Sequence, residues 1–230
     1  MFFISEIGMN YNGNFDLCYE LIRQSKISKA NAVKFQLGWR DKKDDINFLD
    51  KARIKQLIIW AKYFEIEIFF SIITDEALKT LNPFLTKKSK VKIASRTVRD
   101  NPQLAHKILK MNLETIISLG MWNKKKFPFQ KKKNIKYLWC KSTYPNSIDD
   151  LKNLPKKFNS KTYDGFSDHA VGIEASLIAI SRGASIIEKH FTLDKSNTTI
   201  RDHTLSCTPN EFLQLVDLGT EISRKINNGI

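Results

Sequence analysis

Two short stretches near the end of the chain, "FSDH" and "IIEKH", combine residue types that can do chemistry, and each ends on a histidine. Side chains alternate between the faces of a strand, so Ser167 shares a face with His169, and Glu188 shares one with His190. Asp168 then lies on the opposite face, which excludes a Ser-His-Asp nucleophilic triad within the first motif. Two neutral imidazoles from neighbouring strands suit a divalent metal that keeps open coordination positions.

The elements that carry these motifs follow a regular alternation along the chain. Strand-like runs separated by helical patterns predict βαβ units and a parallel sheet. Eight units in 230 residues give about 29 residues each, close to the ~250 residues of a (β/α)₈ barrel. We therefore predict one TIM-barrel domain over residues 1–230. The predicted strands are 2–8, 32–36, 66–72, 90–95, 114–120, 135–140, 164–169 and 184–190.

Local signals indicate where the helices between these strands lie. The apolar residues of 54–61 recur at the spacing of one helix face. Thr208 with Glu211 three residues on forms a capping box, and Ser147 with Asp150 predicts another helix start. A doubly wound open sheet is the alternative fold, but "EIGMNYNG" after the first strand matches neither GxGxxG nor a P-loop. The barrel is therefore the predicted fold.

Composition limits the class of protein. The chain is 42% hydrophobic and 27% charged, which is ordinary for a globular protein. No apolar run is long enough to cross a bilayer, and the first residues, "MFFISEIGMN", do not resemble a signal peptide. The 3 cysteines show no CxxC spacing, so neither a disulfide framework nor a zinc site is indicated. We expect a cytoplasmic protein that does not associate with membranes.

The net charge of +14 is the most unusual feature of the composition. It is compatible with a nucleic acid, an anionic membrane or an anionic small substrate. The densest cluster, "NKKKFPFQKKK" at 123–133, interleaves aromatic rings with lysines as a nucleic-acid patch does. The cluster also contains a proline and lies between two predicted strands. We predict a solvated helix or loop there and do not expect nucleic acid as a partner.

Polar residues recur at the strand ends, where TIM barrels carry their chemistry. Taken singly, an inward lysine could form an ion pair with Glu6 or Glu188 instead of binding a ligand, and a serine could cap the following helix. Taken together, lysines and hydroxyl groups around one opening suit a phosphate or carboxylate. The residues thus indicate a metal-assisted enzyme acting on a small anionic substrate. The strand ends carry Glu6, Lys34, Gln36, Ser71, Lys92, Ser95, Ser118, Ser142, Tyr144, Ser167, His169, Glu188 and His190.

The same segments resemble, in order, the motifs of the sialic acid synthase family, which includes N-acetylneuraminate, legionaminate and pseudaminate synthases. The motifs are "EIGMNYNG", "VKFQ", "VKIAS", "IISLGM", "STYP", "GFSDHAVGIEAS" and "GASIIEKHFTLD". The resemblance implies a transferase that condenses phosphoenolpyruvate with an open-chain N-acylated amino sugar and releases phosphate. It also implies a divalent metal cofactor, Mn²⁺ or Mg²⁺.

The resemblance assigns roles residue by residue. Glu6 and Glu188 match the catalytic carboxylates of the barrel mouth, and His169 and His190 match the metal ligands. The sugar-binding positions correspond to Gln36, Tyr144 and Asp202. The phosphoenolpyruvate-binding positions correspond to Lys34, Lys92, Ser95, Ser118, Ser142 and Ser167.

The sequence departs from the family pattern in the half of the site that holds the sugar. Tyr11 replaces a histidine, and Arg96 and Thr97 replace a Gly-Glu pair. We expect the C-terminal antifreeze-like domain to be absent, and Arg96 or Arg99 to supply the arginine which that domain contributes.

Two alternatives stay open. One is a non-catalytic or partner-dependent phosphoenolpyruvate-binding barrel that needs a separate capping protein or a homo-oligomer. The other is a metal-dependent sugar-phosphate aldolase or isomerase, because one barrel fold hosts many chemistries.

Overall fold

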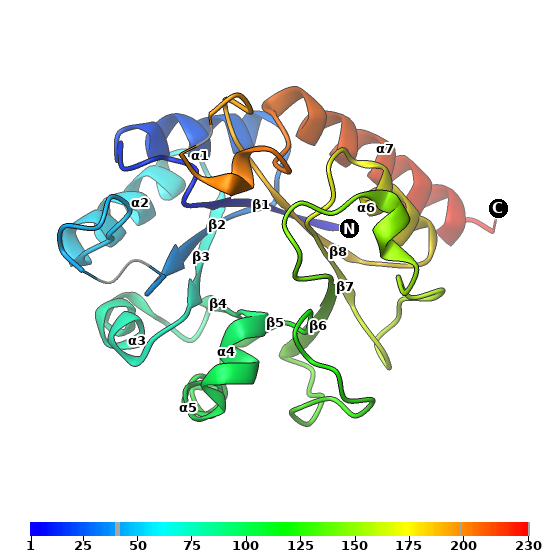
Figure 1. Ribbon diagram of the computed structural model, residues 1–230, viewed down its shortest axis with the longest axis horizontal. Helices are drawn as coiled ribbons and strands as arrows, with labels where there is room; N and C mark the ends of the chain where they lie inside the picture. Colours follow the sequence, from blue (N-terminus) through cyan, green and yellow to red (C-terminus); the bar gives the residue numbers. More distant parts are fainter. Residues whose placement is uncertain (40–41, 198, 230) are drawn as a thin grey trace.

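Eight parallel strands close into a barrel in the order of the sequence, which confirms the predicted fold. The computed structural model describes residues 1–39, 42–197 and 199–229 (Figure 1). The strands fall in the eight predicted runs, with ends shifted by at most a few residues. They are β1 (Phe2–Gly8), β2 (Ala32–Leu37), β3 (Glu67–Ile72), β4 (Lys90–Ile93), β5 (Glu114–Ser118), β6 (Ile135–Cys140), β7 (Gly165–Asp168) and β8 (Ile186–His190).

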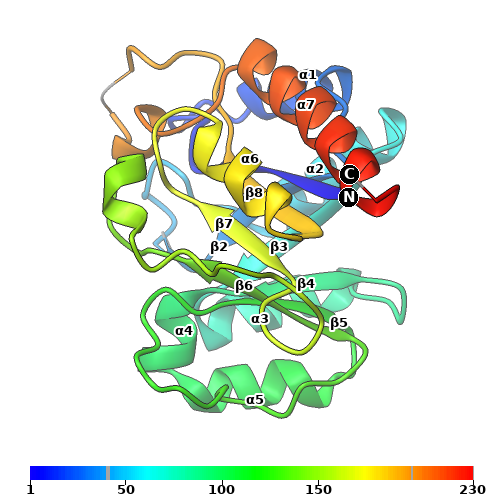
Figure 2. The ribbon, with the colours of Figure 1, turned by 90° about the vertical axis from the view of Figure 1, so that its right-hand side faces the viewer.

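Helices surround the barrel on its outer side (Figures 1 and 2). None of the helices described is long and apolar enough to cross a membrane. The helices are α1 (Leu17–Ile27), α2 (Lys51–Tyr63), α3 (Asp75–Leu81), α4 (Ser95–Asp100), α5 (Pro102–Lys110), α6 (Glu174–Ser181) and α7 (Pro209–Asn227), with 3₁₀ turns η1 (Asn82–Phe84), η2 (Ile148–Leu151) and η3 (Arg201–His203).

The predicted helix starts differ in outcome. Thr208 and Glu211 form the expected reciprocal cap at the start of α7. Asp150 likewise accepts hydrogen bonds from the N–H and hydroxyl of Ser147, but only the single 3₁₀ turn η2 follows. The predicted helix there is wrong. Pro155 disfavours helical backbone at the residue before it and cannot donate its own hydrogen bond, so the segment cannot extend into a longer helix.

The lysine cluster at 123–133, predicted as a solvated helix or loop, forms a loop between β5 and β6. Its aromatic rings face the protein: Phe127 stacks on Tyr137 with ring centroids 4.5 Å apart, and Phe129 packs edge-on against His106 at 5.0 Å. Lys131 Nζ lies 3.1 Å from the buried carboxylate of Asp164. The rings therefore anchor the loop to the barrel and are not offered to bases for stacking.

An apolar layer and a polar layer succeed one another inside the barrel. Ile4, Ala32, Phe69, Ile116, Leu138 and Ile186 form a compact inner cluster. Two residues further along each strand, on the same face, stand Glu6, Lys34, Ser71, Ser118, Cys140 and Glu188. The apolar layer closes the barrel below, so the polar layer faces only the C-terminal opening.

The outward face of β7 and β8 carries a buried ion pair. Asp168 and Lys189 are opposite each other in the register of these strands, with 3.3 Å between the carboxylate and Nζ and no exposed side-chain surface. The Asp168 carboxylate also accepts hydrogen bonds from Ala170 N–H at 2.8 Å and Ser176 Oγ at 2.6 Å. Lys189 donates to the carbonyl of Ala170. Both charges are thus compensated in a layer closed to water.

We expect Lys189→Ala to lower the free energy of unfolding by about 3–5 kcal/mol, because it leaves a buried carboxylate without its cation. Urea unfolding measures the change. Lys29→Ala is the matched control: its ion pair with Asp217 is 59% and 52% exposed, and its loss should be at most about 1 kcal/mol. Equal losses in the two variants would contradict the interpretation, as would an unaltered Lys189→Ala protein.

Candidate active site

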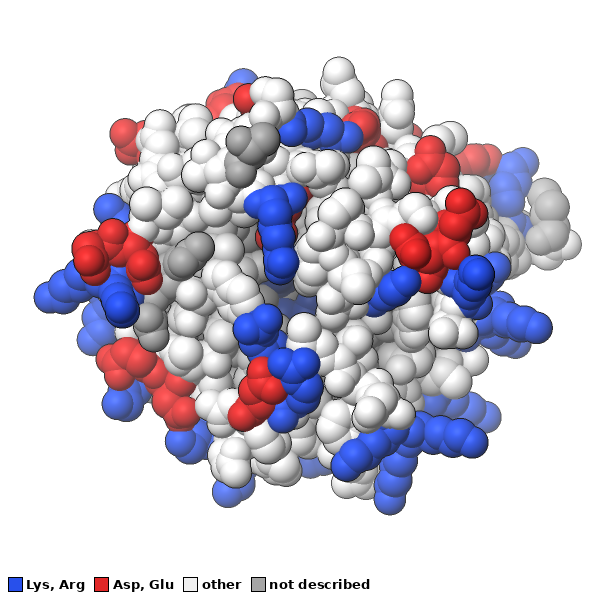
Figure 3. Space-filling view, in the orientation of Figure 1, with Lys and Arg blue, Asp and Glu red and all other residues white. Residues whose placement is uncertain are grey.

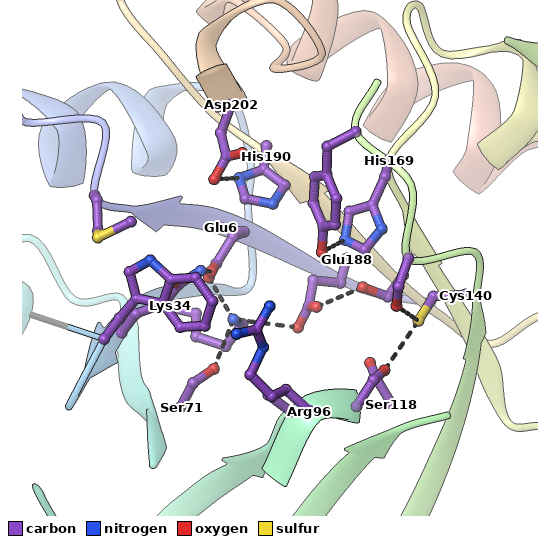
Figure 4. A pocket seen from close by; sticks show the side chains of 18 of the residues that line it. Glu6, Lys34, Ser71, Arg96, Ser118, Cys140, His169, Glu188, His190 and Asp202 are labelled. Atoms are coloured by element: carbon purple, nitrogen blue, oxygen red, sulfur yellow. Dashed lines mark hydrogen bonds and ion pairs between the residues drawn. The ribbon is translucent and has the colours of Figure 1, made fainter. Parts of the chain in front are cut away.

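All eight strands contribute to one cavity of about 730 Å³ at the C-terminal end of the barrel (Figure 4). Every residue that the sequence predicted for the site lies on its wall, although the individual roles stay predictions. These residues are Glu6, Lys34, Gln36, Lys92, Ser95, Ser118, Ser142, Tyr144, Ser167, His169, Glu188, His190 and Asp202.

Four charged side chains form an alternating chain across the floor of this cavity. Lys34 Nζ lies 2.5 Å from Glu6 and 3.8 Å from Glu188. Lys92 Nζ lies 2.5 Å from each carboxylate oxygen of Glu188. Lys34 also donates to Ser71 Oγ at 3.0 Å. The lysines therefore both make buried ion pairs and line the cavity, and the four charges sum to zero.

Neutral side chains complete the contacts of the two carboxylates. Gln36 Nε2 donates to Glu6 Oε1 at 2.6 Å, and Ser167 Oγ donates to Glu188 Oε1 at 2.7 Å. The pairing follows from the strand register, because Glu6 is opposite Lys34 and Ser167 is opposite Glu188. Both carboxylates are thereby held in fixed positions.

The two carboxylates have opposite pKa shifts. Burial raises the pKa of Glu6, an effect that the ammonium group of Lys34 opposes but does not cancel. Burial acts on Glu188 in the same direction, but Lys34 and Lys92 outweigh it and hold its pKa well below the usual range. Glu188 is consequently a fixed anion, whereas Glu6 is the carboxyl that more readily carries a proton.

The two strand-end histidines lie side by side, with ring centroids 5.6 Å apart. His169 Nδ1 lies 2.9 Å from the carbonyl oxygen of Lys141, so this nitrogen carries the proton and donates. Nε2 of the same ring is then the unprotonated nitrogen, and it accepts a hydrogen bond from the hydroxyl of Tyr144 at 3.2 Å. Burial lowers the pKa of both His169 and His190 to about 4. Both rings are therefore neutral at pH 7.

Four buried polar atoms on the cavity wall have no hydrogen-bond partner among the described residues. Glu6 Oε2 is compensated by its ion pair with Lys34, whereas His190 Nδ1, Asp202 Oδ1 and Ser118 Oγ stay without a hydrogen bond. His190 Nδ1 and Asp202 Oδ2 face each other across 4.0 Å, which exceeds a hydrogen bond. Leaving a buried polar group unsatisfied costs about 1–3 kcal/mol. The arrangement is that of a site whose remaining partner is a ligand.

Two arginines at the rim lie over aromatic rings. Arg96 Cζ is 4.5 Å from the ring centroid of Trp39, and Arg201 Cζ is 4.6 Å from that of Tyr144. Sequence reasoning named Arg96 but overlooked Arg201 and Trp39. Their positions in the sequence could have indicated both residues, because Trp39 follows β2 closely and Arg201 directly precedes Asp202. Trp39 lies in the loop after β2 and Arg201 begins the 3₁₀ turn η3, so a strand-based prediction has no register to follow at either residue.

Two polar residues near the site, Arg99 and His203, lie outside the cavity lining. Arg99 does not line the cavity, and its guanidinium pairs with Asp100 at 2.6 Å. Arg96 does line the cavity, and its role as the replacing arginine stays a prediction. His203 lies beside the site and contacts Thr192 Oγ1 at 2.7 Å and Asn12 Oδ1 at 2.9 Å. It secures a loop and does not line the cavity.

Comparison with known proteins places this geometry in a family. The signature of the NeuB family matches residues 41–230. An N,N'-diacetyllegionaminic acid synthase of Campylobacter jejuni is 32% identical over 263 residues, covering 99% of this chain and 78% of that protein. An uncharacterized protein of Methanocaldococcus jannaschii is 34% identical, covering 99% and 72%.

A solved structure gives the same answer. The N-acetylneuraminic acid synthetase of Leptospira borgpetersenii, crystallised with citrate, superimposes with a TM-score of 0.87 at 29% identity, covering 100% of this chain and 86% of that chain. The resemblance to sialic acid synthases that the motifs indicated is therefore confirmed, and the chain belongs to the NeuB family.

Proposed function

We propose that this chain condenses phosphoenolpyruvate with the aldehyde of a sugar, giving a nonulosonic-acid-type 2-keto sugar acid and inorganic phosphate. The observation that carries the proposal is the neutral four-charge floor, Glu6–Lys34–Glu188–Lys92, set beside two neutral histidines in one cavity. Relatives named as synthases of legionaminic, pseudaminic and sialic acids support this reaction class.

Phosphoenolpyruvate would lie above the floor of the cavity. Lys34 and Lys92 supply ammonium donors that can turn toward its phosphate and carboxylate groups. The Ser118 hydroxyl lacks a partner among the described residues and faces the same space. Further hydroxyls stand at Ser95, Ser142 and Ser167. Because each carboxylate of the floor is already paired with a lysine, an anionic substrate meets hydrogen-bond donors there and no unpaired negative charge that would repel it.

The residues present fit a divalent metal at the histidines. His169 Nε2 is unprotonated and could exchange the hydroxyl of Tyr144 for a metal, and the buried His190 Nδ1 and Asp202 Oδ1 lack hydrogen-bond partners among the described residues. No group of three His, Cys, Asp or Glu side chains is clustered tightly enough within the described chain to form a complete cage. His169 and His190 would hold Mn²⁺ or Mg²⁺, leaving open positions for water and substrate. The metal would polarise the sugar aldehyde as a Lewis acid.

The protein's own residues would orient the reactants and move protons. C3 of phosphoenolpyruvate forms a bond to the aldehyde carbon, whose oxygen takes up a proton. Water then adds at C2, and the bond between C2 and the phosphate oxygen breaks to release phosphate. Glu6, with its raised pKa, is placed to exchange the proton of that water. Glu188 stays ionised and keeps both lysines and Ser167 in position.

Phosphate release from phosphoenolpyruvate should require an aldose when Mn²⁺ is present, and a panel of N-acylated hexosamines and simple aldoses identifies the sugar class. We expect Lys92→Met to raise the KM for phosphoenolpyruvate by about tenfold or more, because a charge-assisted contact is lost. Lys29→Met, altered on the surface, should behave as the wild type. Release that ignores the aldehyde, or no release with any aldose while phosphoenolpyruvate binds, would overturn the proposal.

Mn²⁺ binding to the isolated protein tests the metal site without turnover. Calorimetric titration should show one Mn²⁺ per chain, and His169→Ala and His190→Ala should each weaken binding by about tenfold or more. His106→Ala is the matched control, since His106 is exposed on α5. Unchanged affinity in the two site variants, or equal weakening in all three, would remove the histidines from the metal site.

Acid should destabilise the metal-free protein through the same histidines. Their folded pKa values of about 4 lie below the ordinary 6.5, so the unfolded chain binds protons first. The stability that these neutral histidines contribute to the fold is fully present above pH 6.5 and is lost as the pH falls toward 4. Between pH 7 and pH 5 we expect each histidine to lower the free energy of unfolding by about 2 kcal/mol. Urea unfolding of wild type and His190→Asn at both pH values should show a smaller loss in the variant, whereas His106→Asn should keep the full loss.

A further inference from the structure

The rim of the cavity differs in charge from its floor. On the floor, Glu6 and Glu188 balance two lysines. Among the described residues that line the cavity above the floor, one carboxylate, Asp202, stands with two guanidinium groups, Arg96 and Arg201. In the space-filling view, basic side chains border the central hollow of this face (Figure 3). The positive excess therefore lies at the rim, apart from the lysines that would bind phosphoenolpyruvate.

Both arginines are held in a way that leaves their donors available. A guanidinium stacked on an aromatic ring uses its flat face, and its N–H groups point outward along the edge. The guanidinium carbon of Arg96 lies 4.5 Å from the ring centroid of Trp39, and that of Arg201 lies 4.6 Å from the ring centroid of Tyr144, close enough for such a contact. The Nε of Arg201 is 3.5 Å from Asp202, and neither a hydrogen bond nor a further ion pair joins its terminal nitrogens to another described residue. Figure 4 shows Arg96 reaching from α4 into the cavity.

Tyr144 relates this rim to the site of the aldehyde. Its ring centroid is 4.2 Å from that of His169, and its face carries Arg201 at 4.6 Å. A sugar whose aldehyde lies at His169 and His190 would therefore bring its far end within reach of the rim. The two histidines and the two arginines then contact opposite ends of one acceptor.

We propose that the acceptor sugar bears an anionic group, a phosphate or a carboxylate, at the end remote from its aldehyde, and that Arg96 and Arg201 bind it. This inference rests on the proposed function and deepens it, since it names the class of acceptor. Planar guanidinium edges match the paired oxygens of either anion. The side chains of Arg96 and Arg201 are thus the determinants that select a charged sugar over a neutral one.

The test compares N-acetylmannosamine with its 6-phosphate, and glucose with glucuronic acid, in the phosphate-release assay with Mn²⁺. We expect kcat/KM to be about tenfold to a hundredfold higher for the charged member of at least one pair. Preference in the first pair identifies a phosphate, and preference in the second identifies a carboxylate. Arg96→Gln and Arg201→Gln should lower that ratio of charged to neutral by about tenfold or more. Arg99→Gln, paired with Asp100 outside the cavity, should keep the ratio.

Binding measurements separate failure of this inference from failure of the proposed reaction. If no sugar drives phosphate release, calorimetry with N-acetylmannosamine 6-phosphate and with glucuronic acid still reports recognition of the anion. Tight binding that weakens about tenfold in Arg96→Gln, but not in Arg99→Gln, supports the arginines even without turnover. Equal kcat/KM for charged and neutral sugars, or an unchanged ratio in both variants, would overturn the inference, as would absent binding in the calorimetric arm.

Discussion

The arrangement of the site depends on Glu188, a buried carboxylate held between two lysines near the axis of the barrel. Removing either lysine would leave charge uncompensated in a place closed to water, so the pairs constrain each other's positions. The same carboxylate accepts the hydroxyl of Ser167 and fixes the geometry of β7 relative to β8. One anion, Glu188, thus determines where Lys34 and Lys92 lie, links β7 to β8 and balances the charge of the floor.

The rest of the cavity can be understood as layers on this floor. The apolar cluster that includes Phe69 and Leu138 seals the barrel below, and the neutral histidines stand to one side above. The arginines with their aromatic supports form the rim. Each layer offers different side chains: paired lysines and carboxylates on the floor, neutral imidazoles above it, and guanidinium groups at the rim. One acceptor and one phosphoenolpyruvate molecule would each find matching groups at separate depths.

Strand residues could be placed from alternation alone, whereas site residues outside the strands, such as Tyr144 and Asp202, were named only through the family motifs. The two-residue alternation along a strand carried Glu6, Lys34 and Glu188 to one face, which periodicity alone could foresee. Arg201 and Trp39 could not be placed, because neither a loop nor a single 3₁₀ turn has a repeating pattern long enough to relate sequence spacing to direction. The helix expected after Ser147 failed for a related reason: a correct cap starts a turn, but only a continued apolar face without a proline extends it.

The ion pair of Asp168 and Lys189 lies on the outer face of the sheet, yet each of its members immediately precedes one of the two histidines in the chain. Because side chains alternate between the two faces of a strand, the outward ion pair between β7 and β8 also holds the inward histidines of these strands at a fixed spacing. A change in the wall between barrel and α6 would then alter the distance between the imidazoles without touching the cavity. The spacing of the two imidazoles proposed to hold a metal thus depends on Asp168 and Lys189, two residues that do not line the cavity.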